Sequence, residues 1–261
     1  MKLAANLSLM YGEWAFVERI AEAAQDGFEA VECMFPYHVP AEQLKTHSDL
    51  HGLRWALINA PAGDWAAGDR GLACLAHRRD EFREAIDQAA YYAQALAVPC
   101  VHVLAGALHP GADAKARDAA WNTYQDNLTW VADTMADVPV TWLVEPINTR
   151  DVPGYLLNTQ AQAHALVQDL NRSNLGVQMD LYHCQIVEGD VVRKLEHYLP
   201  TGRVKHIQIA GVPERHEPSR SELNYPRVFE CLKAMGYQGH VGCEYRPQAG
   251  TRAGLGWRRM L

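Results

Sequence analysis

Eight apolar segments recur along the chain, and each of the first seven is followed by a stretch with helical spacing. We expect strands at residues 3–7, 30–34, 55–59, 100–105, 141–145, 175–180, 204–210 and 240–245. We expect helices at residues 14–24, 40–51, 79–97, 114–135, 159–170, 191–198 and 226–235. Gly27 and Gly52 follow the first two helices as stop signals, and Thr159 can cap the fifth.

This alternation constrains the fold more than any other feature of the sequence. Eight strands alternating with helices over about 250 residues are typical of a (β/α)8 barrel. The doubly wound open sheet is the alternative, but no G-x-G-x-x-G sequence follows the first strand. Most of the strands are continuous apolar runs, as expected when both faces are buried. We therefore predict an α/β protein with one TIM-barrel domain over residues 1–261.

Charge and hydropathy exclude several classes of partner. The chain has 31 acidic and 24 basic side chains, a formal charge of −7, so it lacks the basic surplus that a phosphate backbone requires. Its longest apolar stretches, such as residues 138–144, fall far short of the ~20 residues of a membrane helix. The first residues do not follow a signal-peptide pattern. We expect a cytoplasmic protein that binds neither nucleic acid nor membrane; the sequence leaves open whether it forms a homo-oligomer.

The six cysteines are scattered and include no C-x-x-C pair. Four of them lie in apolar surroundings, where a reduced thiol behaves as a small hydrophobic group. The cysteine pattern therefore predicts reduced thiols and no zinc cluster.

Four consecutive predicted strands end in a polar side chain: Glu145, Asp180, Gln208 and Glu244. The carboxyl ends of barrel strands meet at one mouth, where active sites of this fold lie. Three buried carboxylates at one mouth would repel one another without a cation between them. Oxygen ligands suit Mg²⁺ or Mn²⁺ better than zinc. The four residues therefore predict a divalent metal site.

The alternative for each acid is a structural role, as a helix cap or as the partner of an arginine. The arginines available at the rim are Arg150, Arg203, Arg215 and Arg246. A structural role is less expected for polar residues at four successive strand ends, because residues that cap helices at the barrel rim lie in the loops that follow the strands.

Two further residues follow these strands. His183 lies three positions after Asp180, from where it can turn over the mouth and bind a substrate oxygen. Arg215 lies in the loop after the seventh strand and could hold a substrate carboxylate bidentately. A solvated loop arginine is the alternative for Arg215, and a surface histidine or one satisfied within the protein is the alternative for His183.

Seven segments of the chain resemble the hydroxypyruvate isomerases, which belong to the xylose-isomerase-like barrel superfamily. The most unusual is residues 61–71, Pro-Ala-Gly-Asp-Trp-Ala-Ala-Gly-Asp-Arg-Gly. The others are residues 5–8, 31–37, 145–148, 151–154, 206–210 and 242–245. Ketose 3-epimerases of the superfamily carry His where this chain has Gln208, and its DNA-repair endonucleases use several histidine ligands and a basic groove.

The resemblance implies that Glu145 and Glu244 are the proton donor and acceptor, and that Glu145, Asp180, Gln208 and Glu244 hold the metal. The implied reaction interconverts hydroxypyruvate and tartronate semialdehyde through an enediolate. The same groups would serve a 2-oxo-tetronate isomerase or a related sugar-acid isomerase or epimerase, and a non-catalytic sugar-acid-binding barrel is the remote alternative. We expect the size of the pocket to distinguish these substrates, through the aromatic residues Trp14, Phe35, Trp65 and Tyr245.

Overall fold

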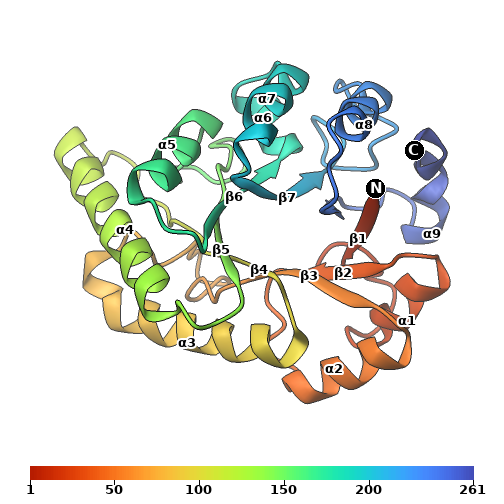
Figure 1. The fold of residues 1–261 in the computed structure, drawn as a ribbon, viewed down its shortest axis with the longest axis horizontal. Helices are drawn as coiled ribbons and strands as arrows, with labels where there is room; N and C mark the ends of the chain where they lie inside the picture. Colours follow the sequence, from red (N-terminus) through yellow and green to blue (C-terminus); the bar gives the residue numbers. More distant parts are fainter.

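A closed barrel of eight parallel strands forms the centre of the computed structural model, which describes residues 1–261 (Figure 1). The strands are β1 (Lys2–Asn6), β2 (Ala30–Cys33), β3 (Arg54–Asn59), β4 (Cys100–His102), β5 (Thr141–Val144), β6 (Leu175–Asp180), β7 (Val204–Ile209) and β8 (His240–Cys243). Each strand pairs with its neighbours in chain order, and β8 closes the barrel by pairing with β1, with Lys2 opposite His240. The predicted TIM barrel is thus confirmed.

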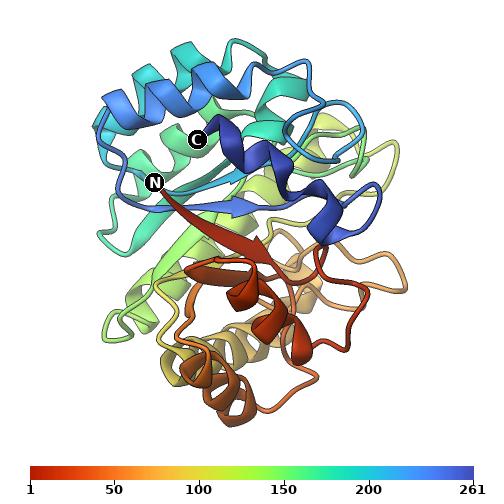
Figure 2. The same cartoon turned by 90° about the vertical axis from the view of Figure 1, so that its right-hand side faces the viewer.

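The helices lie around the outside of the strands, as Figure 1 shows. The α-helices are α1 (Glu18–Gln25), α2 (Ala41–Leu50), α3 (Arg79–Leu96), α4 (Ala114–Thr134), α5 (Gln160–Leu170), α6 (Leu181–Val187), α7 (Val191–Tyr198), α8 (Tyr225–Ala234) and α9 (Thr251–Gly254). Short 3₁₀ helices are η1 (Ala76–Arg78), η2 (Leu199–Thr201) and η3 (Leu255–Met260). The turned view of Figure 2 places α9 and η3 beside the N-terminal strand. Arg252 of α9 binds Asp26 after α1, which ties the C-terminal segment to the first helix.

The predicted helix boundaries follow from local chemistry. Thr159 caps α5 in a capping box, accepting from the Gln162 amide while the Gln162 side chain accepts from the Thr159 amide. Gly27 and Gly52 have φ of +76° and +67°, which allows the chain to leave α1 and α2. The first helix begins at Glu18 and not near Trp14, because the residues before it form turns.

One helix next to the barrel mouth was not predicted. α6 follows β6 without a connecting loop, and Asp180 caps it by accepting the Tyr182 amide at 2.8 Å. A helix of seven residues contains too few turns to produce a clear apolar period. Its position brings His183 back over the end of β6, as predicted for that residue.

The core is one large apolar cluster between the strands and the surrounding helices. All six cysteines are buried and free, whereas the sequence placed only four of them in apolar surroundings. No helix combines the length and the apolar character that crossing a membrane requires.

Candidate active site

A cavity of about 530 Å³ opens at the carboxyl ends of the strands. Its polar and charged lining consists of Asn59, Arg70, His102, Glu145, Arg150, Asp151, Tyr182, His183, Glu214, Arg215, Glu244 and Arg246. The cavity therefore lies where catalytic groups of this fold are found.

Five residues, here called the mouth cluster, lie at this end of the barrel: Glu145, Asp180, His183, Arg215 and Glu244. Glu145 and Glu244 come directly after β5 and β8, and Asp180 is the last residue of β6. All three carboxylates are buried. The strand ends thus bring together three of the four predicted metal ligands and both predicted substrate-binding residues.

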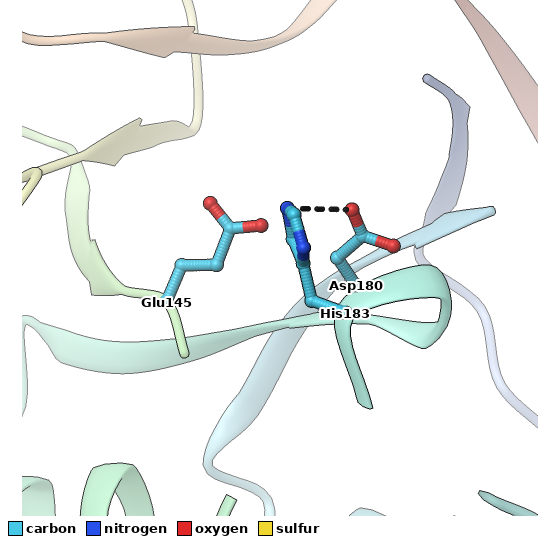
Figure 3. Close-up of side chains that lie close together, drawn as sticks. All are labelled: Glu145, Asp180 and His183. Carbon is cyan, nitrogen blue, oxygen red and sulfur yellow. Dashed lines mark ion pairs between the residues drawn. The ribbon is translucent and has the colours of Figure 1, made fainter. Parts of the chain in front are cut away.

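Glu145, Asp180 and His183 come closest to forming a metal site. Each offers one ligand atom, and these atoms lie within 4.8 Å of one another. Figure 3 shows the three side chains close together. Glu145 Oε1 and Asp180 Oδ2 are buried without a hydrogen-bond partner. His102 Nδ1 lies 3.1 Å from Glu145 Oε2, yet neither nitrogen of this buried ring makes a hydrogen bond. Unpartnered buried oxygens are costly, so this arrangement fits a site that a cation completes.

The hydrogen bonds of His183 determine which of its nitrogens carries the proton. The backbone N–H of Asn148 donates to Nδ1 at 3.4 Å, and the Asn148 amide nitrogen is 2.6 Å from the same atom. Burial and the nearby Arg215 lower the pKa of His183 well below its usual value, so the ring is neutral. Nε2 therefore carries the proton and lies 3.6 Å from Asp180 Oδ2. This tautomer makes His183 a hydrogen-bond donor at the mouth.

Burial also changes the acidity of the three carboxyl groups. Burial, followed by the charges of Glu244 and Asp180, raises the pKa of Glu145 well above its usual value. Burial raises the pKa of Glu244 to about 7 and that of Asp180 to about 6, although Arg215 opposes both shifts. Without a cation, the mouth cluster therefore retains protons near neutral pH. Carboxyl groups with such values can both accept and donate protons.

Arg215 bridges two of the acids. Its Nη2 donates to Glu244 Oε2 and lies 3.7 Å from Asp180 Oδ2. Its guanidinium also lies 5.0 Å from the centre of the Tyr182 ring. The backbone of Arg215 has φ of +58°, an uncommon conformation for a residue with a side chain. Glu244 is thus the partner of an arginine, which was the structural alternative for this acid. Binding of a substrate carboxylate by Arg215 stays a prediction.

Gln208, the fourth predicted metal ligand, belongs to a different set of contacts. We call this set the interior network: Asn6, Glu32, Gln178, His206 and Gln208, all buried inside the barrel. Glu32 Oε1 accepts from Asn6 at 2.9 Å and from Gln208 at 2.7 Å, and Oε2 lies 2.7 Å from His206 Nε2. Gln208 Oε1 accepts from Gln178 at 2.6 Å. Both ends of the Gln208 amide therefore have protein partners, and its role as a metal ligand stays a prediction.

Sequence reasoning missed Glu32 and His102. The sequence does contain a signal for such residues, namely a charged or polar side chain within an otherwise apolar strand. Glu32, for example, lies between Val31 and Cys33. Gly242 makes room for it, since a Cβ there would lie 2.2 Å from Glu32 Oε2. Asn6 links the interior network to the mouth cluster, because its amide also donates to Glu244 Oε1 at 3.4 Å.

Of the four aromatic residues expected to set pocket size, Trp65 lines the cavity. Phe35 packs on Trp65, with ring centres 5.2 Å apart. Tyr245 is buried and accepts a hydrogen bond from Trp257, and Trp14 packs on Tyr11, so neither lines the cavity.

Comparison with known proteins identifies the group to which this barrel and site belong. The family model for the xylose isomerase-like TIM barrel matches residues 20–261. The 2-oxo-tetronate isomerase of Cupriavidus necator is 53% identical over 98% of this chain and 96% of its own. The hydroxypyruvate isomerase of Escherichia coli is 40% identical over 98% of both chains. A crystal structure described as an AP endonuclease, family 2, from Brucella melitensis superposes with a TM-score of 0.93, at 45% identity over 99% of this chain and 98% of its own.

The chain therefore belongs to the xylose isomerase-like TIM barrel family. Within it, the chain is an isomerase of the hydroxypyruvate and 2-oxo-tetronate isomerase group, which implies a small sugar acid as substrate.

Proposed function

We propose that this protein isomerises 2-oxo-tetronate to its 3-oxo isomer, with hydroxypyruvate as the second candidate substrate. The observation that carries an isomerase mechanism is that Glu145 and Glu244 line the same cavity, both buried and both with a raised pKa. A reaction that moves a proton between adjacent carbons needs one group to take it and another to deliver it.

The preference for 2-oxo-tetronate rests on the relatives. A protein of that name is 53% identical to this chain, against 40% for the Escherichia coli hydroxypyruvate isomerase. The two substrates require the same bond changes at C2 and C3, so the mouth cluster can serve either acid. Hydroxypyruvate, the substrate that the sequence resemblance implied first, therefore becomes the second candidate.

The proposed chemistry assigns each residue a step. One glutamate removes the proton from C3 of the substrate, which gives an enediolate, and the other delivers a proton to C2. The hydroxyl proton passes from the C3 oxygen to the C2 oxygen, and proton exchange with solvent returns the two glutamates to their starting states, so the atoms and charges balance. His183 Nε2–H donates to one of these oxygens, and Arg215 lies beside them through its contact with Glu244. Burial of the cluster strengthens these electrostatic contacts.

The residues of the mouth cluster also fit a divalent metal. Glu145, Asp180 and Glu244 would hold it with oxygen atoms, together with Gln208 if its amide turns from its present partners. Hard oxygen donors favour Mg²⁺ or Mn²⁺. When bound, such a cation neutralises negative charge that develops on the substrate oxygens. The neutral His183, whose Nε2 carries a proton, is better suited to bind substrate than metal.

Side-by-side assays test this proposal. We expect the purified protein to turn over 2-oxo-tetronate with a higher kcat/KM than hydroxypyruvate, and chelator treatment to reduce both activities until Mg²⁺ or Mn²⁺ is restored. A duplex containing an abasic site serves as the nuclease control and should remain intact. No turnover of either acid, with metal present, would contradict the proposal; a higher kcat/KM for hydroxypyruvate would reverse the substrate preference.

A further inference from the structure

The cavity contains more positive groups than the mouth cluster needs. Four arginines line it: Arg70, Arg150, Arg215 and Arg246. Arg215 is committed to Glu244 and Asp180, and Arg150 has Asp151 at 3.8 Å. The ion pairs of the molecule include neither Arg70 nor Arg246. These two arginines are therefore the ones available to a negatively charged ligand.

Arg70 is the better positioned of the two. Its Nη1 donates to the carbonyl oxygens of Trp65 at 3.1 Å and Asp69 at 2.6 Å. Its guanidinium lies 4.1 Å from the centre of the Trp65 ring, which in turn packs on Phe35. The side chain of Arg246, by contrast, is exposed and makes no hydrogen bond within the protein. The guanidinium of Arg70 is thus fixed before any ligand binds, which reduces the entropy lost on binding.

The acid next to Arg70 in sequence does not neutralise it. The Asp69 carboxylate binds Arg78 Nη1 at 2.7 Å and the Asp64 amide at 2.7 Å. Gly71, at the end of this loop, has φ of +118°, and a Cβ there would lie 2.5 Å from the Leu104 carbonyl oxygen. The loop is therefore packed tightly against the segment after β4. These contacts engage the Asp69 carboxylate with Arg78 and Asp64, so it forms no ion pair with the Arg70 guanidinium at the cavity.

The pattern of used and free donors matches one ligand chemistry. Both hydrogen bonds of Arg70 use Nη1, so the edge formed by Nε and Nη2 has no partner within the protein. Two parallel N–H donors are the arrangement that binds a carboxylate bidentately. An unpaired cation is needed here, because the chain has a net charge of −7 and the mouth itself holds three carboxyl groups.

We propose that Arg70 binds the carboxylate of the substrate and so determines the preference for short 2-oxo acids over neutral ketoses. This inference rests on the proposed function, because it assumes that the substrate is a sugar acid. Arg215 then lies beside Glu244 at the reacting carbons, and Arg70 holds the carboxylate, which is bonded directly to C2.

Substitution of Arg70 tests the assignment with paired substrates. We expect Arg70→Met to lower kcat/KM on 2-oxo-tetronate about 10- to 100-fold, mainly through a higher KM, because a charge-assisted contact present throughout the reaction is lost. Any turnover of the neutral ketotetrose, in which a hydroxymethyl group replaces the carboxylate, should not change. Arg70→Lys keeps the charge without the fork and should give an intermediate KM.

The control is Arg83→Met on α3. Arg83 also stacks on a tryptophan, at 5.2 Å from the Trp130 ring centre, but lies outside the cavity. The Arg83→Met substitution removes the same charge as Arg70→Met and should leave the kinetics of both substrates unchanged. Equal losses on the acid and the ketotetrose would mean that Arg70 only supports its loop. If only Arg215→Met or only Arg246→Met raised the KM for 2-oxo-tetronate, the substrate carboxylate would be assigned to that arginine in place of Arg70.

Calorimetry with tetronate, an acid that lacks the reacting carbonyl, separates this inference from the proposed function. We expect tetronate to bind the wild-type protein and to bind Arg70→Met about 10- to 100-fold more weakly. If the wild-type protein converts neither 2-oxo acid, the proposed function is wrong, but tetronate binding still decides the role of Arg70. Equal tetronate affinity in the two proteins, or no binding to either, would overturn the inference.

Discussion

Two groups of buried polar residues lie within the same barrel, and they differ in how fully they are hydrogen-bonded. In the interior network, both carboxylate oxygens of Glu32 have protein partners. In the mouth cluster, Glu145 Oε1 and Asp180 Oδ2 have no partner, although both side chains are buried, as that of Glu32 is. Burial alone therefore does not distinguish a structural carboxylate from a functional one.

The difference has an energetic meaning. A buried polar group without a partner costs about 1–3 kcal/mol, and more if it is charged. Glu32 avoids this cost through its contacts with Asn6 on β1 and with His206 and Gln208 on β7, although Gln178 Oε1 on β6 has no partner. The mouth cluster keeps it, and its carboxyl groups respond by holding protons. A ligand that supplies the missing partners would gain this free energy on binding, which is why the second group is the candidate site.

The largest expected effect is on catalysis by the mouth cluster. Glu145→Gln and Glu244→Gln keep the side-chain size and an oxygen, but neither amide can accept a proton from carbon. We expect each variant to lose about 10²- to 10⁴-fold in kcat on the preferred 2-oxo acid. Steady-state kinetics with metal present check this, and near-normal activity in either variant would contradict the assigned role.

The interior network should respond in stability. Glu32→Leu leaves the donors of Asn6, Gln208 and His206 without their shared acceptor. Each buried donor left without an acceptor costs about 1–3 kcal/mol, so we expect the free energy of unfolding in urea to fall by about 3–5 kcal/mol. Glu145→Gln should change it far less. Equal destabilisation by the two variants would remove the distinction between the groups.

Metal binding provides an intermediate effect. Asp180→Ala removes an oxygen that has no protein partner and also the cap of α6. We expect Mn²⁺ affinity, measured by calorimetry on chelator-treated protein, to fall at least about 10-fold. Asp113→Ala removes the cap of α4, where Asp113 accepts from the Ala116 amide, and is the matched control. Unchanged Mn²⁺ affinity in Asp180→Ala would show that the metal ligands lie elsewhere.

The fold and the mouth were predictable because their signals are repeated. Eight apolar runs gave the barrel, and the barrel rule that strand ends meet at one mouth then brought Glu145, Asp180 and Glu244 together. His183 was placed correctly over the mouth from its position after Asp180, without knowledge of α6. Such patterns survive errors of a few residues at element boundaries.

The interior network was not predictable because it depends on single contacts between distant strands. Glu32 and His206 are 174 residues apart, and nothing in either strand specifies the partner. The commitment of Arg215 to Glu244 likewise depends on the path of a loop in a left-handed conformation. Hydrogen-bond partners of this kind require coordinates, whereas the end of a strand can be read from the sequence.

The smallest expected effect is a pH dependence that separates the mouth cluster from the rest of the protein. In chelator-treated protein, burial raises the pKa of Asp180 from 3.8 to about 6 and that of Glu244 from 4.5 to about 7, and it raises that of Glu145 in the same direction. The folded state then binds more protons than the unfolded state. The contribution of Asp180 and Glu244 to the free energy of unfolding is therefore fully present below about pH 4 and is lost as the pH rises to 7.

Glu145→Gln removes one of these titrations, so its free energy of unfolding relative to metal-free wild type should rise steadily from pH 5 to pH 8, within about 1–3 kcal/mol. Urea unfolding at each pH measures the difference, and Glu188→Gln, at a carboxylate paired with Lys194 outside the cavity, is the control. Saturating Mn²⁺ should stabilise the wild type most at high pH, because the cation replaces the protons that the cluster has lost. A difference between Glu145→Gln and wild type that stays constant with pH would mean that Glu145 is already ionised without metal, and would remove this distinction of the mouth cluster from the rest of the protein.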